Sequence, residues 1–323
     1  MPTSSPTPGT RPLAPLVLAL GSFDGVHLGH RQILARAQTL AAEMDGVAGV
    51  LTYDPLPAQL IYPDFTYVLT PLTEKCRLLT ELGIGQIRVI RFDRAVQQTE
   101  PEDFVRQHVV SEPAPAAVVI GHDHRFGCKG RGDAQLLARL LEPRHIRLEV
   151  VPEYTLLGGP VRSTRIREAL LLGHVKLAAD LLGRYYSLSG TIVPGTGTGR
   201  RLGFPTVNLR PIERESLVPA DGVYVARADL LGRRFDAVLN IGHRPTFGGE
   251  TRTIEAHLLD LQHDIQPPGA TFHIIDRLRP ERRFASAEAL STQIAADVAQ
   301  AHALLCRLPP LPNLDMDSKS NNL

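Results

Sequence analysis

Two patterns of apolar and polar positions follow one another along the chain. In the first half, short aliphatic or β-branched runs alternate with longer segments whose apolar residues recur every three or four positions. The runs predict buried strands and the longer segments predict helices, and their alternation predicts an α/β fold with an open, mostly parallel sheet. The predicted strands are Leu16–Leu20, Val47–Thr52, Ile87–Ile90, Ala117–Ile120 and Leu148–Val151, and the predicted helices are Arg31–Glu43, Leu72–Leu82, Pro101–Val109 and Ala134–Leu141.

The pattern changes near Gly183, after two further helical segments, Thr164–Leu172 and Val175–Leu182. From Tyr186 onward, short alternating segments bounded by Gly and Pro predict a small antiparallel β-barrel, and Ser286–Leu305 predicts a closing helix. The predicted barrel strands are Leu188–Val193, Val223–Ala228, Phe235–Ile241, Thr253–Leu259 and Thr271–Arg279. The expected domains are residues 13–183 and 184–307, with a disordered leader over 1–12 and a flexible tail over 308–323.

Composition narrows the function classes. The 323 residues carry a net charge of +1, no Trp and 5% aromatic residues, which argues against a nucleic-acid surface. The three cysteines form no CxxC pair, so free thiols in a reducing compartment are expected. The apolar run Leu13–Leu20 is too short for a membrane span, and no signal peptide precedes it. We therefore expect a cytoplasmic protein that binds neither nucleic acid nor membrane.

The strongest local signal in the first half is the segment from Leu20 to His30, in which a strand runs through a glycine-containing turn into a helix. His27 and His30 then lie at the helix N-terminus, beside free amides and the positive end of the dipole. Imidazoles in that position can donate hydrogen bonds to phosphate oxygens, and Gly29 allows close approach of a phosphate chain. Two isolated histidines would indicate no more than an ordinary helix start, but the strand–turn–helix context favours a phosphate site.

A second helix start follows Gly158 and Gly159, where Ser163 or Thr164 suits an N-cap and Glu168 gives partial capping-box character. Alone, this segment is a helix start with solvated arginines. Combined with the histidines, its hydroxyls and Arg167 can hold the β- and γ-phosphates of a nucleotide.

In the second half, a loop with Gly195, Gly197 and Gly199 leads into the extended segment Gly203–Asn208. Thr206 and Asn208 point to the same side of that segment, so their oxygens can reach one hard cation such as Mg²⁺. The alternative is a polar strand edge beside an ordinary turn. Glu255 lies on the polar face of the Thr253–Leu259 strand, where a carboxylate is more often a solvated surface group.

The pair His122 and His124 is spaced by one residue, which on a strand is a metal-ligand spacing. Because Arg125 and Phe126 follow at the expected strand end, we interpret the pair as a pocket wall.

Longer strings carry a family resemblance. The first half, through the string Gly21–His30 and the segment Ser163–Arg167, resembles the nucleotidyltransferase superfamily with its HxGH motif. With the strings Thr52–Pro57 and Gly121–Gly127, it is similar to the FMN adenylyltransferase domain of bacterial bifunctional riboflavin kinase/FAD synthetases. The second half resembles riboflavin kinase through Gly203–Asn208, Asn240–Phe247, Thr253–Asp260 and Leu278–Glu281.

The resemblance implies riboflavin phosphorylation to FMN and then adenylyl transfer from ATP to FMN, giving FAD and pyrophosphate, with Mg²⁺ required. It assigns catalysis to His27, His30, Arg167 and Glu255, with Glu255 as general base toward the ribityl hydroxyl, and Mg²⁺ to Thr206 and Asn208. Nucleotide contacts are expected from Gly21, Phe23, Asp24, Gly29, Ser163, Thr164, Gly195, Gly199, Gly203 and Pro205. Flavin contacts are expected from Asp54, Pro55, Pro57, Asp123 and Phe126.

The chain departs from the family pattern at three places: Arg162 replaces a serine, His124 replaces a phenylalanine, and Ile265–Gly269 replaces a Leu-Tyr-Gly turn. Three alternatives stay open. HxGH adenylyltransferases also act on pantetheine phosphate or nicotinate mononucleotide, the histidines could hold the metal of a hydrolase, and a flavin-binding regulator would share the sites.

Overall fold

The computed structural model describes residues 14–62, 64–65, 67–195, 197–246, 249–259 and 268–308. The predicted leader, the tail after Leu308 and most of Ile265–Gly269 lie outside these ranges. The chain forms two compact units, one of Met1–Asp64 with Leu72–Pro160 and one of Phe65–Pro71 with Val161–Leu323. The edge at Pro160 precedes the boundary expected near Gly183 because the two helices between them pack with the second unit. As a division of function, the boundary at Gly183 stays a prediction.

The first unit contains the predicted parallel sheet. Its strands are β1 (Leu16–Leu20), β2 (Val47–Asp54), β3 (Gln86–Arg91), β4 (Ala117–Gly121) and β5 (Arg147–Val151), in the order β3-β2-β1-β4-β5. Every neighbouring pair is parallel. The strand order reverses beside β1, since the chain first adds β2 and β3 on one side and then β4 and β5 on the other.

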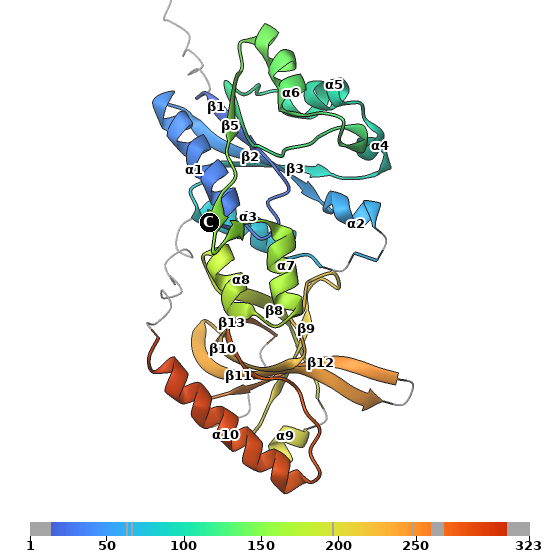
Figure 1. Cartoon of the computed structure of the whole chain (residues 1–323), viewed down its shortest axis with the longest axis vertical. Helices are drawn as coiled ribbons and strands as arrows, with labels where there is room; N and C mark the ends of the chain where they lie inside the picture. Colours follow the sequence, from blue (N-terminus) through green and yellow to red (C-terminus); the bar gives the residue numbers. More distant parts are fainter. Residues whose placement is uncertain are drawn as a thin grey trace, which may run out of the picture. The chain divides into compact units, whose positions relative to one another are not determined.

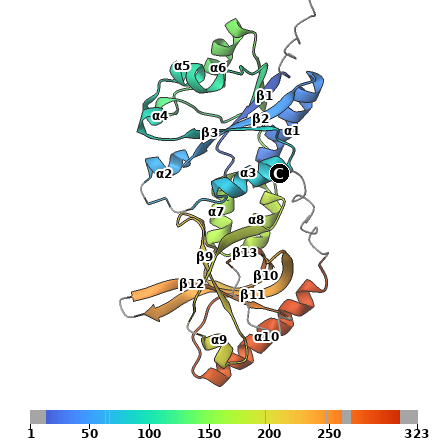
Figure 2. The ribbon, with the colours of Figure 1, turned by 180° about the vertical axis from the view of Figure 1, so that it is seen from behind.

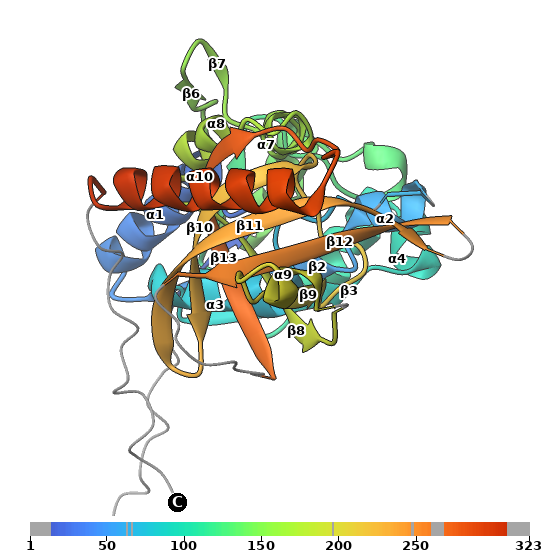
Figure 3. The same cartoon turned by 90° about the horizontal axis from the view of Figure 1, so that it is seen from below.

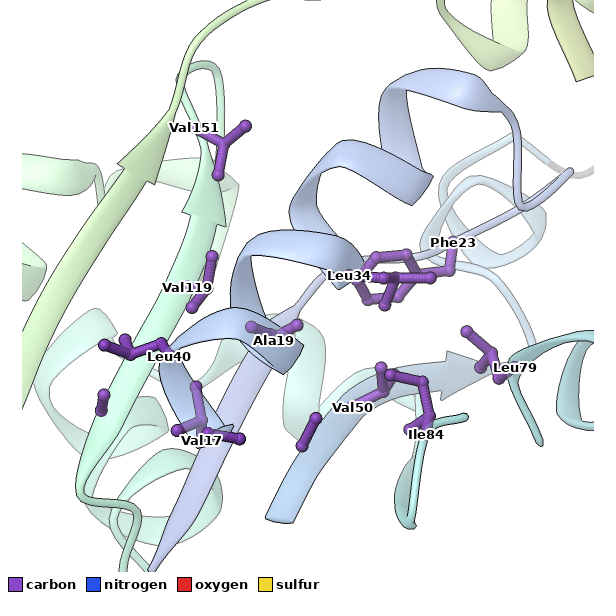
Figure 4. Packing of buried hydrophobic residues seen from close by; sticks show 14 of the residues in the cluster. Val17, Ala19, Phe23, Leu34, Leu40, Val50, Leu79, Ile84, Val119 and Val151 are labelled. Atoms are coloured by element: carbon purple, nitrogen blue, oxygen red, sulfur yellow. The ribbon is translucent and has the colours of Figure 1, made fainter. Parts of the chain in front are cut away.

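Helices cover both faces of this sheet (Figures 1 and 2). On one face, α1 (Leu28–Glu43) and α3 (Leu72–Glu81) pack on alternate strand residues such as Val17, Ala19 and Val50 (Figure 4). On the other face, α5 (Pro101–Phe104), the π-helical turn η1 (Val105–Val109) and α6 (Ala134–Leu141) pack on the intervening residues. The continuous apolar runs of the sequence reflect this burial on both sides.

The second unit is built on a closed antiparallel barrel with strand order β10-β11-β12-β9-β8-β13. The strands are β8 (Tyr186–Val193), β9 (Val207–Pro211), β10 (Gly222–Leu230), β11 (Arg233–Thr246), β12 (Gly249–Leu258) and β13 (Gly269–Arg279). The helix α10 (Ala287–Leu305) lies along the outside of the barrel (Figure 3), where Ala301 and Leu305 pack on β10, β11 and β13. Arg279 on β13 fixes it with bonds of 2.8–3.1 Å to the buried carboxylate of Asp297.

Two helices and a two-stranded hairpin precede the barrel in the chain. The hairpin is β6 (Thr155–Leu156) with β7 (Gly159–Pro160), and the helices α7 (Ser163–Leu171) and α8 (Val175–Leu182) follow. Short elements absent from the sequence expectation are this hairpin, α2 (Pro57–Ile61), α4 (Arg94–Gln98), α9 (Thr198–Arg201) and the 3-10 turns η2 (Cys128–Gly130) and η3 (Glu142–Arg144).

Within the described part of the chain, every helix is too short or too polar to cross a membrane.

Candidate active sites

The first candidate site follows β1, where the order of the sheet reverses. Ligands of open parallel sheets bind outside the carboxyl ends of the strands at such a point. The loop from Gly21 to Val26 begins there, and two of its residues, Phe23 (φ 49°) and Val26 (φ 41°), have left-handed backbone conformations. Because such conformations are costly for a β-branched or aromatic residue, they concentrate at functional sites.

His27 and His30 lie where this loop enters α1. His27 is the N-cap, and its Nδ1 accepts a hydrogen bond of 3.2 Å from the backbone N–H of His30. The two imidazoles stack with centroids 3.6 Å apart, and the ring of Phe23 contacts His30 edge-on at 5.2 Å. The predicted helix start is confirmed, and it holds both imidazoles at one helix N-terminus.

Lys75 supports this loop, and the sequence reasoning did not identify it. It lies on α3 with 1% of its surface exposed, and its Nζ donates to the carbonyl oxygens of Ser22 (3.2 Å) and Tyr53 (3.0 Å). Thr52 Oγ1 donates to the same Ser22 carbonyl at 2.9 Å. The available signal was a lysine on the apolar face of a predicted helix, because a buried ammonium requires polar partners.

The residues predicted for the flavin follow β2 and β4. Asp54 is the last residue of β2, Pro55 follows it, and Pro57 begins α2. Asp123 lies exposed in the turn after β4, whereas Phe126 is buried against Phe104 with ring centroids 5.9 Å apart. Two strand ends thus carry the predicted residues, and their contacts with a flavin stay predictions.

His122 and His124 lie beyond the end of β4, so the strand spacing considered for metal ligands does not apply to them, and their interpretation as a pocket wall stays a prediction. β4 ends at Gly121, and the chain turns so that the N–H of His124 donates to the Gly121 carbonyl at 3.1 Å. The His124 ring stacks on Phe126, and its Nε2 is buried with no hydrogen-bond partner among the described residues. Although the residue as a whole keeps some exposed surface, burial lowers the pKa of His124 to about 4, against a smaller opposite effect of the Asp123 carboxylate.

Replacing His124 with phenylalanine should therefore stabilise the protein, most of all in acid. Between pH 6.5 and 4 the unfolded chain binds a proton that the folded protein excludes, so folding stability falls as the pH drops through this window. The full pH-dependent loss is about 3 kcal/mol. Removing the buried nitrogen should also add about 1–3 kcal/mol at neutral pH.

The measurement is urea unfolding of the parent and His124→Phe at pH 7 and pH 5. The stability advantage of the variant should grow by about 2 kcal/mol between the two pH values. An equal advantage at both would show that His124 titrates normally in the folded protein.

The second helix start differs in detail from the prediction. The N-cap of α7 is Arg162, without a side-chain capping bond, so neither Ser163 nor Thr164 is the cap. Ser163 is already the first helical residue, because Arg162 supplies the extended cap conformation. Arg167 Nε donates to the Tyr67 carbonyl at 2.8 Å, and its guanidinium lies over the Phe65 ring. All of these residues belong to the second compact unit, and their predicted role toward phosphates stays a prediction.

The second candidate site is on the barrel, where β9 pairs with β12. Asn208 is paired directly with Glu255, and Thr206 precedes β9. Thr206 Oγ1 lies 3.5 Å from Glu255 Oε2, and Asn208 is buried. On β12, Thr253, Glu255 and His257 are half-buried while Ile254, Ala256 and Leu258 are buried, which confirms the expected alternation. Oxygen-bearing side chains from two segments distant in sequence, Thr206 and Asn208 on one and Glu255 on the other, therefore meet at one place.

Glycines make room for this group. A Cβ on Gly195 would overlap the Asn208 amide, and one on Gly199 would overlap the Phe204 carbonyl and press on Thr206 at 3.1 Å. Gly203 has φ 86°, which favours glycine. The predicted loop includes the short helix α9, and after it the carbonyl of Pro205 lies 2.8 Å from His257 Nδ1. The loop that carries these glycines thus lies close to Asn208 on β9 and His257 on β12.

Known proteins resemble the chain over most of its length. The bifunctional riboflavin kinase/FMN adenylyltransferase of Pseudomonas fluorescens is 34% identical over 289 residues, covering 89% of this chain and 92% of that protein. The protein of that name from Escherichia coli K12 is 35% identical over 285 residues, covering 87% and 90%. The crystal structure of a protein called macrolide-efflux protein, from Streptococcus pneumoniae, has a TM-score of 0.82 and 28% identity, covering 91% of this chain and 95% of that one.

Fold and sites together define a two-domain transferase, with an α/β sheet of the nucleotidyltransferase type and a β-barrel of the riboflavin kinase type. Residues 10–165 match the family model of FAD synthetase, and residues 182–305 match that of riboflavin kinase. The chain belongs to the family of bifunctional riboflavin kinase/FMN adenylyltransferases.

Proposed function

We propose that the barrel transfers the γ-phosphoryl group of ATP to riboflavin, and that the sheet domain then transfers the adenylyl group of a second ATP to the resulting FMN. The observation that carries the kinase half is the convergence of Thr206, Asn208 and Glu255 at the β9–β12 pairing. The adenylyltransferase half rests on the stacked imidazoles at the N-terminus of α1.

For the kinase step, Thr206 and Asn208 offer a hydroxyl and an amide oxygen, which suit Mg²⁺. The ion would supply charge neutralisation along the phosphate chain. Glu255 is proposed to accept the proton of the ribityl 5′-hydroxyl as its oxygen bonds to the γ-phosphorus, while the bond from that phosphorus to the β-phosphate bridging oxygen breaks and ADP leaves. The glycines at 195, 199 and 203 are proposed to let the phosphates approach the backbone.

For the adenylyl step, a phosphate oxygen of FMN attacks the α-phosphorus of ATP, the α–β bridge breaks and pyrophosphate leaves. No proton has to be taken from a phosphate that is already ionised. We propose that His27 and His30 donate hydrogen bonds to the α-phosphate oxygens, where charge increases in the transition state. The roles of Ser163, Thr164 and Arg167 toward the leaving pyrophosphate, and of Asp54, Pro55, Pro57, Asp123 and Phe126 toward the flavin, are proposed on the resemblance alone.

The test is chromatography of flavins after incubating the full chain with riboflavin, ATP and Mg²⁺. FMN should form first and FAD afterwards, with one pyrophosphate per FAD. Omitting Mg²⁺ should abolish FMN formation. The proposal would be refuted if neither product appeared although the chain was folded. Conversion of pantetheine phosphate or nicotinate mononucleotide instead of FMN would give the sheet domain a different substrate.

A further inference from the structure

A cluster of three possible metal ligands lies on the barrel, apart from the residues proposed for catalysis. It consists of Asp221, directly before β10, His243 on β11, and Glu281, two residues after β13, and we call it the Asp–His–Glu cluster. The three are far apart in the sequence, and the pairing of β10 with both β11 and β13 brings them together. One ligand atom from each lies within 4.8 Å of the other two.

The cluster is held by specific contacts. His243 Nδ1 lies 2.8 Å from Asp221 Oδ2, and the backbone N–H of His243 donates to Glu281 Oε2 at 3.3 Å. A Cβ on Gly242 would overlap the Glu281 carboxylate, so glycine at this position lets the carboxylate lie against the strand. Because these contacts already hold the side chains in position before an ion binds, the side chains lose little conformational entropy on binding.

An ordinary ion-pair network explains only part of this arrangement. Arg252 pairs with Asp221, but its Nε and one terminal nitrogen both contact Oδ1, at 2.9 and 2.8 Å, which leaves Oδ2 directed toward His243. The same guanidinium donates to the Val218 carbonyl at 3.3 Å. For Glu281, no basic side chain lies within ion-pair distance in the described part of the structure. Arg252 therefore orients Asp221, as residues that hydrogen-bond to metal ligands commonly do. Its positive charge also lowers the net negative charge of the Asp–His–Glu cluster.

We propose that the Asp–His–Glu cluster binds one divalent transition-metal ion, with zinc as the best-suited of the common ions. An imidazole nitrogen with two carboxylate oxygens is a zinc ligand set, and a water completes a tetrahedral shell. Mg²⁺ prefers oxygen ligands and octahedral geometry, so it does not compete at an imidazole site. His243 and Glu281 are exposed, which gives the ion a path from solvent. The ion would link the start of β10, β11 and the segment after β13.

The experiment is calorimetric titration of the full chain, with any affinity tag removed, with Zn²⁺ in millimolar Mg²⁺ and without nucleotide. One Zn²⁺ per chain should bind, and the thermal unfolding midpoint should rise with added Zn²⁺. His243→Ala, Asp221→Asn and Glu281→Gln should each weaken binding by about 10–100-fold or more. Co²⁺ in place of Zn²⁺ should give a visible absorption spectrum that His243→Ala loses.

The matched control is His302→Ala, which removes a histidine from α10 and should leave Zn²⁺ binding unchanged. Zinc can also bind the free thiols, of which Cys306 is exposed, so the deciding quantity is the difference between parent and His243→Ala. Equal Zn²⁺ binding in these two proteins, or none at micromolar Zn²⁺, would overturn the proposal. Neither result bears on flavin synthesis, which the product assay tests separately.

Discussion

The variant His30→Ala should convert riboflavin to FMN at the parental rate and accumulate it, with FAD synthesis reduced by about 10²–10³-fold in kcat. That loss is typical of removing one preorganised donor to a transition-state anion. Alanine keeps the backbone N–H that donates to His27 Nδ1, so the cap of α1 persists. The measurement is the initial rate of FAD formation from supplied FMN, with FMN formation by the same chain as an internal standard.

His30→Ala is a cleaner test than His27→Ala. Because the His27 side chain is the N-cap, its removal should cost about 0.5–2 kcal/mol of stability in addition to any catalytic effect. A matched control is His145→Asn, an exposed histidine in a left-handed conformation that asparagine tolerates. The control should form both products normally. Unimpaired FAD synthesis by His30→Ala would remove this imidazole from the mechanism.

Regular alternation of apolar and polar positions made much of the fold predictable. The inner strands β1, β2 and β4 of the sheet are predicted within a few residues because they are buried on both faces and read as nearly continuous apolar runs, whereas the edge strands β3 and β5 are only partly buried. The barrel strand carrying Glu255 is predicted because one face is buried and the other is not. In the sheet and in the barrel alike, burial of a strand face is visible in the sequence as a pattern of apolar positions.

Contacts between segments that are distant in sequence could not be predicted from the pattern of apolar positions. Val68 pairs with Ser216 and so joins the segment Phe65–Pro71 to the second compact unit, although it interrupts the first unit in sequence. The start of α7 shows a similar limit at short range. Ser163 has the preferred cap side chain, but it is already the first helical residue and Arg162 is the N-cap, a one-residue difference that propensity alone does not resolve.

The candidate sites also contain some features that the sequence predicts and others that depend on the fold. His27 and His30 were identified because their motif lies at a predictable helix start. The pairing of Asn208 with Glu255 was not predictable in register, because it depends on how β9 and β12 meet in the closed barrel. Lys75 offered one sequence signal, its place on the apolar face of a predicted helix, but its partners depend on the fold. The buried Nε2 of His124, which has no hydrogen-bond partner among the described residues, became visible only once the surroundings of the ring were known.

The second large effect is expected for Glu255→Gln, which should lose riboflavin phosphorylation and keep adenylyl transfer to supplied FMN. Glutamine preserves the size of the side chain and an oxygen near the Thr206 hydroxyl, but it cannot accept the proton of the attacking hydroxyl. Removing a general base lowers the rate by about 10²–10⁴-fold. The measurement is FMN formation under saturating ATP and riboflavin, with FAD formation from FMN measured on the same sample.

Two controls separate a missing base from a disturbed barrel. Glu288→Gln changes an exposed carboxylate at the start of α10 and should leave both reactions intact. Riboflavin binding by Glu255→Gln should stay near the parental value, because the base acts on the reacting hydroxyl and not on the flavin ring, so the loss appears in kcat rather than in KM. If Glu255→Gln phosphorylated riboflavin at the parental rate, the proton would have to leave by another route, and Glu255 would be a ligand or a structural partner of Thr206 and Asn208 instead.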